Sequence, residues 1–153
     1  RVRQTMNPVM VFKEGGPPSQ GGTIGGSGAA NTRQLVLVCG TPGADTQVQT
    51  NLQVITHVLD FGMTVAEAVE APRWRNAQSP TESMLPHVCD DLLYLEERFP
   101  ADVRDGLKKR GHALSIIGPW EGRGSQMMIQ VHSDTGVLQG AADPRRDGYA
   151  IGC

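Results

Sequence analysis

Residues 35–55 read LVLVCGTPGADTQVQTNLQVI, an apolar run joined to a helical pattern by a turn that contains two glycines and a proline. The run 34–39 is apolar after its first residue, which is typical of a strand covered on both faces. After the turn, apolar side chains recur three or four positions apart and predict an amphipathic helix to about Asp60. These periodic positions are Val48, Leu52, Ile55, Val58 and Leu59.

The turn between this strand and helix presents backbone N–H groups. Gly40 ends the strand, Gly43 and Ala44 follow, and Asp45 or Thr46 is the expected N-cap. N–H groups at such a junction point outward, where the helix dipole adds positive charge, so a phosphate cradle, an oxyanion hole or a tight connection without ligand would each fit. The Lys and Ser or Thr of a phosphate-binding loop are missing. The residues alone favour the tight connection and leave the oxyanion hole open.

The segments before this stretch predict a strand and a loop. Residues 8–12 form a short apolar run and predict a strand, in which Pro8 is tolerable only at the start. Residues 13–32 are rich in Gly, Pro and Ser and predict a flexible Gly-rich loop, because such a composition cannot offset the entropy cost of ordering.

The segments after it alternate between helix and strand signals. The TVAE pattern from Thr64 predicts a capping box and a short helix that ends at Pro72. Residues 92–99 fit a strand or a helix, and a further helix runs from Pro100 to a closing glycine. A strand at 112–118 and a hairpin with an SDTG turn follow. The order predicts one domain over residues 1–153, α+β or layered α/β, with helices on a mainly antiparallel sheet.

Composition excludes several function classes. The chain has 153 residues, a net charge of −2 and scattered arginines, so neither nucleic acid nor an anionic membrane surface is an expected partner. Three cysteines without close spacing argue against a disulfide framework or a zinc site. The four histidines lack metal-ligand spacing and are expected on the surface or satisfied in the core. No stretch is long and apolar enough to cross a bilayer.

The acidic residues offer few candidate sites. Asp90 and Asp91, like Glu96 and Glu97, are sequence neighbours that point apart on a strand, so neither pair predicts a two-carboxylate site. In the motif ADPRRDG, an aspartate and an arginine two residues later predict an ion pair that stabilises a turn.

Several motifs in order resemble the small subunit of the gamma-glutamyltransferase family. GTPGAD followed by LQVITHVLDFGMTVAEAVEAPR is similar to that family's Gly-Ser-Pro-Gly-Gly turn and its following LQVI..VIDFGM..AEAV.APR segment. QTMNPVMVF, LKKRGH and SQMMIQVHSDTGVLQGAADPR resemble further family segments at similar spacing. The likeness covers nearly the whole chain, apart from the Gly-rich insertion and residues 76–91.

The resemblance implies an N-terminal-nucleophile hydrolase fold, an αββα sandwich. It implies a precursor that cuts itself and exposes a threonine, whose hydroxyl attacks a gamma-glutamyl amide with its own α-amino group as base. Members need no metal or organic cofactor. The implied partners are the large subunit and the N-terminal part of the small subunit, and the implied compartment is periplasmic or extracellular. Self-association through apolar surface left uncovered is also expected.

Carried over by position, Gly43 and Ala44 would present the oxyanion hole, and Gln4 and Thr5 would bind the substrate's α-carboxylate. The family has a second glycine where this chain has Ala44, and Ser-Ser where it has Gln-Thr. The resemblance places the nucleophilic threonine upstream of Arg1, so the isolated chain is expected to be inactive. Two alternatives accompany this hypothesis: a related acylase with another amide substrate, and a catalytically lapsed homologue that serves as a scaffold or small-ligand binder.

Overall fold

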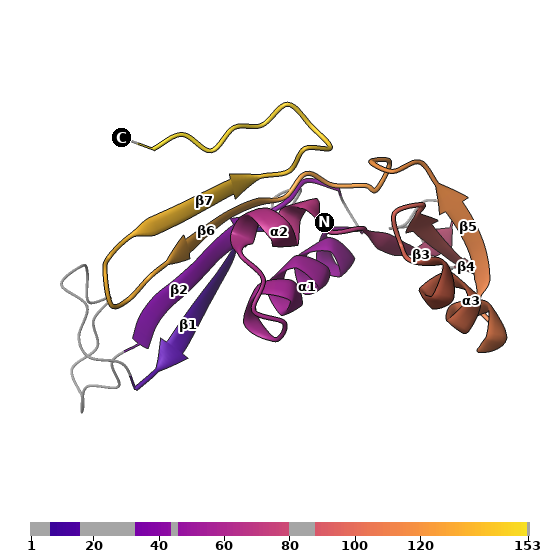
Figure 1. The fold of residues 1–153 in the computed structure, drawn as a ribbon, viewed down its shortest axis with the longest axis horizontal. Helices are drawn as coiled ribbons and strands as arrows, with labels where there is room; N and C mark the ends of the chain where they lie inside the picture. The colour runs from indigo at the N-terminus through magenta and orange to yellow at the C-terminus, as the bar shows by residue number, and fades with distance from the viewer. Residues whose placement is uncertain (1–6, 16–32, 44–45, 80–87, 153) are drawn as a thin grey trace.

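The computed structural model describes residues 7–15, 33–43, 46–79 and 88–152. They form an α+β fold with mainly antiparallel sheets, as predicted (Figure 1). Its elements in chain order are β1 (Val9–Glu14), β2 (Arg33–Gly40), α1 (Thr46–Leu59), α2 (Val65–Glu70), β3 (Trp74–Ser79), β4 (Val88–Glu96), α3 (Ala101–Lys109), β5 (Ala113–Ile117), β6 (Met127–Val131) and β7 (Leu138–Ala142).

The strands form two separate sheets. The larger is antiparallel in the order β1-β2-β6-β7, and the predicted hairpin supplies its last two strands. The smaller has the order β3-β4-β5, with β3 antiparallel and β5 parallel to β4. In Figure 1 the larger sheet occupies the left of the molecule with α1 and α2 beside it, and the smaller sheet lies at the right with α3.

Strand register divides the larger sheet into a covered and an open face. Leu37, Cys39 and Met128 on one face are buried beneath α1 and α2, and they form the core with helix residues such as Val54 and Val69. Successive residues on a strand point to opposite faces, so Val38 lies on the face opposite Leu37 and Cys39. Its cross-strand partners Met10 and Ile129 lie on that same open face. Within the described chain only one face of residues 34–39 is buried, so the covering of their other face stays a prediction.

Helix α1 has the predicted extent, but only part of its predicted apolar stripe faces the core: Val58 is buried there and Ile55 packs against it. Val48, Leu52 and Leu59 are 68%, 55% and 49% exposed. The buried side is largely polar and includes Asn51 and Gln53. Polar residues occupy this side because they bond to neighbouring backbone and side chains, which an apolar periodicity cannot reveal.

Several local predictions are confirmed. Thr64 and Glu67 form a complete capping box at the start of α2. Gly62, which has φ +68°, follows the end of α1, as the C-terminal signal predicted. For residues 92–99, which fit either a strand or a helix by sequence, the structure shows a strand that ends at Glu96.

Other boundaries differ from the predictions. Lys13 and Glu14, assigned to the Gly-rich loop, belong to β1. Strand β3 was not predicted, because WRNAQS carries no apolar alternation. No helix in the described part of the chain has the length and apolar character of a membrane span.

Candidate functional site

The glycine turn links the end of β2 to the start of α1, where the sequence motif placed it. Gly43 has φ +138°, a region that favours glycine, and its carbonyl accepts hydrogen bonds from the Thr46 N–H at 3.0 Å and the Thr46 hydroxyl at 2.7 Å. A Cβ on Gly43 would lie 2.6 Å from Thr46 Oγ1. The carbonyl is thus tied to the helix start, and the Gly43 N–H makes no hydrogen bond to another described residue.

The structure does not describe the other three predicted site residues. Gln4, Thr5 and Ala44 lie outside the described residues, as does the N-cap candidate Asp45. Of the four residues that the sequence assigned to the site, the structure therefore describes Gly43 alone.

A second loop approaches the turn from the start of β6. The Cα of Gly124 would be 3.8 Å from a Cβ on Gly43, and the neighbouring Ser125 N–H donates to Thr41 Oγ1 at 2.9 Å. A hollow of about 130 Å³ opens beside these segments. Its lining includes Thr46, Thr50, Arg75, Tyr94, Glu121 and Arg123. Sequence reasoning did not single out this loop, because nothing local connects it with the turn more than eighty residues earlier.

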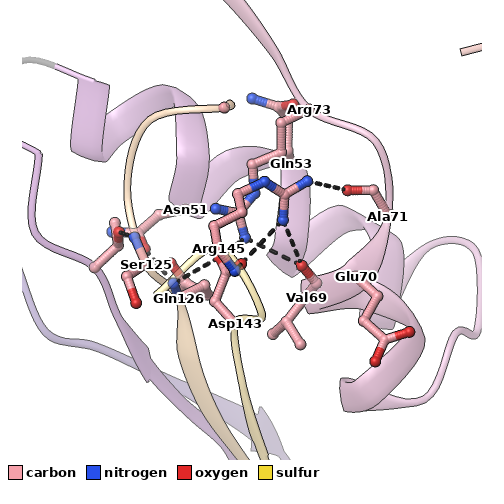
Figure 2. Close-up of polar contacts among 12 residues, drawn as sticks. Asn51, Gln53, Val69, Glu70, Ala71, Arg73, Ser125, Gln126, Asp143 and Arg145 are labelled. Carbon is pink, nitrogen blue, oxygen red and sulfur yellow. Dashed lines mark hydrogen bonds and ion pairs between the residues drawn. The ribbon is translucent and has the colours of Figure 1, made fainter. Parts of the chain in front are cut away.

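A buried ion cluster of Arg73, Glu96, Asp143 and Arg145 joins the two sheets (Figure 2 shows three of its members). Arg145 donates from Nε and Nη2 to the two oxygens of Glu96 at 2.7 and 2.6 Å, and from Nη1 to Asp143 at 3.0 Å. Arg73 pairs with the other oxygen of Asp143. The turn-stabilising pair predicted in ADPRRDG is confirmed, and it is one part of a larger cluster.

Glu96 is the most heavily bonded acceptor of the cluster. Its side chain is fully buried, while that of Glu97 is exposed, so the two neighbours point apart as predicted. It also accepts from the backbone N–H groups of Arg73 and Gly122. A Cβ on Gly122 would lie 2.6 Å from the carboxylate, so only glycine allows this approach. Burial acts to raise the pKa of Glu96, but the hydrogen bonds and charge of Arg145 outweigh it and hold that pKa below its usual range.

The cluster is also tied to α2. Arg145 donates to the carbonyls of Val69 and Ala71 at 2.9 Å each, and Arg73 donates to Val69 at 3.3 Å (Figure 2). These carbonyls lie at the C-terminal end of α2, where a helix presents partial negative charge. The two arginines therefore fix α2 against the ends of β4 and β7.

A relay of hydrogen bonds connects the cluster with the helix that follows the glycine turn. Asp143 accepts from the Gln126 N–H at 2.9 Å, and the Gln126 side-chain amide donates to Asn51 on α1 at 3.1 Å. Both Gln126 and Asn51 are buried. The cluster thereby helps to set the position of α1, and with it the orientation of the turn.

Comparison with known proteins identifies the family. The family described as Gamma-glutamyltranspeptidase matches residues 28–153. A glutathione hydrolase-like YwrD proenzyme of Bacillus subtilis is 32% identical over 99% of this chain, which spans 24% of that protein. An acylase ACY 1 proenzyme of Pseudomonas sp. is 33% identical over 99% of this chain, which spans 21% of that protein.

A solved structure agrees with the sequence matches. The gamma-glutamyltranspeptidase of Helicobacter pylori is 32% identical to this chain and superposes with a TM-score of 0.65, covering 93% of this chain and 61% of that one. The chain thus spans about a quarter or less of the curated relatives and under two thirds of the matched structural chain. Its fold is part of the N-terminal-nucleophile hydrolase architecture. From its motifs, its fold and these matches, the chain belongs to the gamma-glutamyltranspeptidase family.

Proposed function

We propose that the protein containing this chain transfers or hydrolyses gamma-glutamyl amides through an acyl-enzyme on an N-terminal threonine. The threonine belongs to the part of the precursor outside these residues. Its hydroxyl oxygen bonds to the amide carbon, and its proton passes by way of the α-amino group to the departing amine as the C–N bond breaks. Water or an acceptor amine then attacks the ester and regenerates the threonine.

This chain contributes the oxyanion contacts in the proposal. The observation that carries it is the conformation of Gly43: its carbonyl is bonded to Thr46 at the helix start, and its N–H has no partner among the described residues. With the N–H of Ala44, it would donate to the carbonyl oxygen as that oxygen becomes negative. The N-terminus of α1 favours the same charge.

Gln4 and Thr5 complete the proposed site by donating hydrogen bonds to the α-carboxylate of the gamma-glutamyl group. Replacing Thr5 with valine in the full-length protein would then raise KM for a gamma-glutamyl anilide more than it lowers kcat. An unchanged KM would remove Thr5 from the site.

The rest of the precursor is the proposed partner, and the open face of the larger sheet supports this. Met10, Met127, Ile129 and Leu138 are 59%, 54%, 45% and 65% exposed. An apolar sheet face of this kind normally packs against another layer. The matched relatives are proenzymes several times longer than this chain, so a second sheet from the same precursor can cover it.

The decisive experiment places Gly43→Ala in the full-length protein and follows release of the anilide from a gamma-glutamyl anilide. A methyl group at this φ and this distance from Thr46 must move the turn, so kcat is expected to fall by about two orders of magnitude or more. Gly62→Ala is the matched control, because Gly62 also has positive φ but has open space around it. Equal activities of the two variants would refute the role of the turn, and turnover by the isolated chain would reveal another nucleophile.

Relatedness to an acylase supports a second candidate, hydrolysis of a different amide on the same turn. Comparing a gamma-glutamyl anilide with a glutaryl anilide separates the two, because the glutaryl group keeps the terminal carboxylate but lacks the α-amino group. Faster turnover of the glutaryl compound would favour the acylase. No turnover of either by the full-length protein would favour a lapsed homologue.

A further inference from the structure

The outward side of α1 carries a regular apolar stripe that we name the outer stripe: Val48, Leu52, Ile55 and Leu59. Its spacing is four, three and four residues, which is the spacing of a seam along which two helices pack. Three members are about half or more exposed, and Ile55 lies at the edge of the core.

Three of the four members of the outer stripe, Val48, Leu52 and Leu59, are not covered within the described chain. Successive helical residues are rotated by roughly 100°, so Leu52 lies almost opposite the buried Val54. The layer that would cover the open face of the larger sheet cannot reach this side either, because α1 lies against the opposite face of that sheet. The stripe therefore requires its own cover.

We infer that an amphipathic helix from the part of the precursor outside these 153 residues packs along the outer stripe. The four-three-four spacing favours a helix over a strand, since a strand presents residues with a period of two and does not match a seam along a helix. Phe61, 71% exposed just after the end of α1, extends the apolar surface beyond Leu59.

The size of the stripe favours the same polypeptide over a second copy of the chain. The helix has 14 residues and is therefore about 21 Å long. A stable interface between separate proteins buries roughly 1,200–2,000 Å², which is more than one short stripe supplies. A helix on the same precursor acts at high effective concentration, so a small contact suffices. The relatives are four to five times longer than the matched region, which leaves ample chain to supply it.

This inference rests on family membership, on the exposure of α1 and on the proposed partnership with the rest of a longer precursor, and it does not require the catalytic proposal. Its test places a photo-reactive benzoylphenylalanine at Val48 or Leu52 of the full-length protein, with Asp105 on α3 as an exposed control position. The products are mapped by mass spectrometry, with mixed ¹⁴N and ¹⁵N copies to distinguish cross-links within one molecule from those between molecules.

The expected result is cross-linking at both stripe positions to one segment outside residues 1–153, at sites three or four residues apart. Leu52→Cys should also react with a maleimide at least tenfold more slowly in native protein than in urea. Cross-links only between copies, attachment to alternate residues of an extended segment, or a Leu52→Cys rate equal to that in urea would each overturn the inference. Loss of gamma-glutamyl transfer in an active-site variant would leave these outcomes unchanged.

Discussion

The side-chain amide of Gln53 pairs with both backbone groups of Trp74: Nε2 donates to the carbonyl at 3.0 Å, and Oε1 accepts from the N–H at 3.0 Å. Trp74 begins β3, the edge strand of the smaller sheet. Gln49 makes the same pair of contacts with Asn76 one helical turn earlier. Two glutamines on α1 thus take the place of a neighbouring strand and hold the two halves of the molecule together.

Replacing Gln53 with methionine should destabilise the protein by about 2 kcal/mol, because the Trp74 N–H and carbonyl lose their partner in a partly buried setting. Urea unfolding measures the change. Gln49→Met is the matched control and should cost less, since its contacts are exposed and one of them is long at 3.4 Å. Equal costs would show that burial does not determine the value of these bonds.

Replacing Glu96 with glutamine should cost about 3–5 kcal/mol, because it removes the charge that compensates buried arginines. The Arg145 and Glu96 side chains are 1% and 0% exposed, so little water is available to replace the lost interaction. Chemical denaturation provides the measurement, with the exposed Glu97→Gln as control. A loss below 1 kcal/mol for Glu96→Gln would mean that the cluster contributes little to stability.

His57 should make stability fall as the solution becomes mildly acidic. Burial is the main cause that lowers its pKa in the folded protein, so the unfolded chain takes up the proton at a higher pH than the folded protein does. The contribution is fully present above the ordinary histidine pKa of roughly 6.5 and is lost as pH falls below it. Unfolding free energies from pH 7 to 5 should decline less in His57→Gln. Parallel pH curves for the two proteins would contradict the assignment.

Cys39 should resist alkylation in the native protein. Burial raises the pKa of its thiol to about 11, so only roughly one molecule in a thousand carries the thiolate at pH 8. Peptide mapping after iodoacetamide treatment should find Cys39 unmodified in native protein and modified in urea. Rapid native labelling at pH 8 would show that this side of the larger sheet opens readily.

Much of the fold could be predicted locally. The capping box at Thr64, the positive φ at Gly62 and the hairpin at 126–143 each follow from residues within a few positions of one another. The strand β3 could not be predicted in this way, because its stability comes from β4 on one edge and from glutamines on α1 at the other.

The candidate site likewise has features that local sequence predicts and features that depend on long-range contacts. The GTPG motif located the glycine turn and its connection to a helix, since turn chemistry is local. The approach of Gly124, the relay from Asp143 through Gln126 to Asn51, and the central place of Glu96 depend on residues far apart in the chain.

By itself, the sequence determined the family, the order of most elements and the position of the turn, because each is encoded in short-range pattern and residue type. The tertiary structure alone decided which side of α1 is buried and which carboxylate balances the arginines. Periodicity shows that a helix has an apolar side, but only the surrounding backbone, with its own hydrogen-bonding demands, determines which side faces inward.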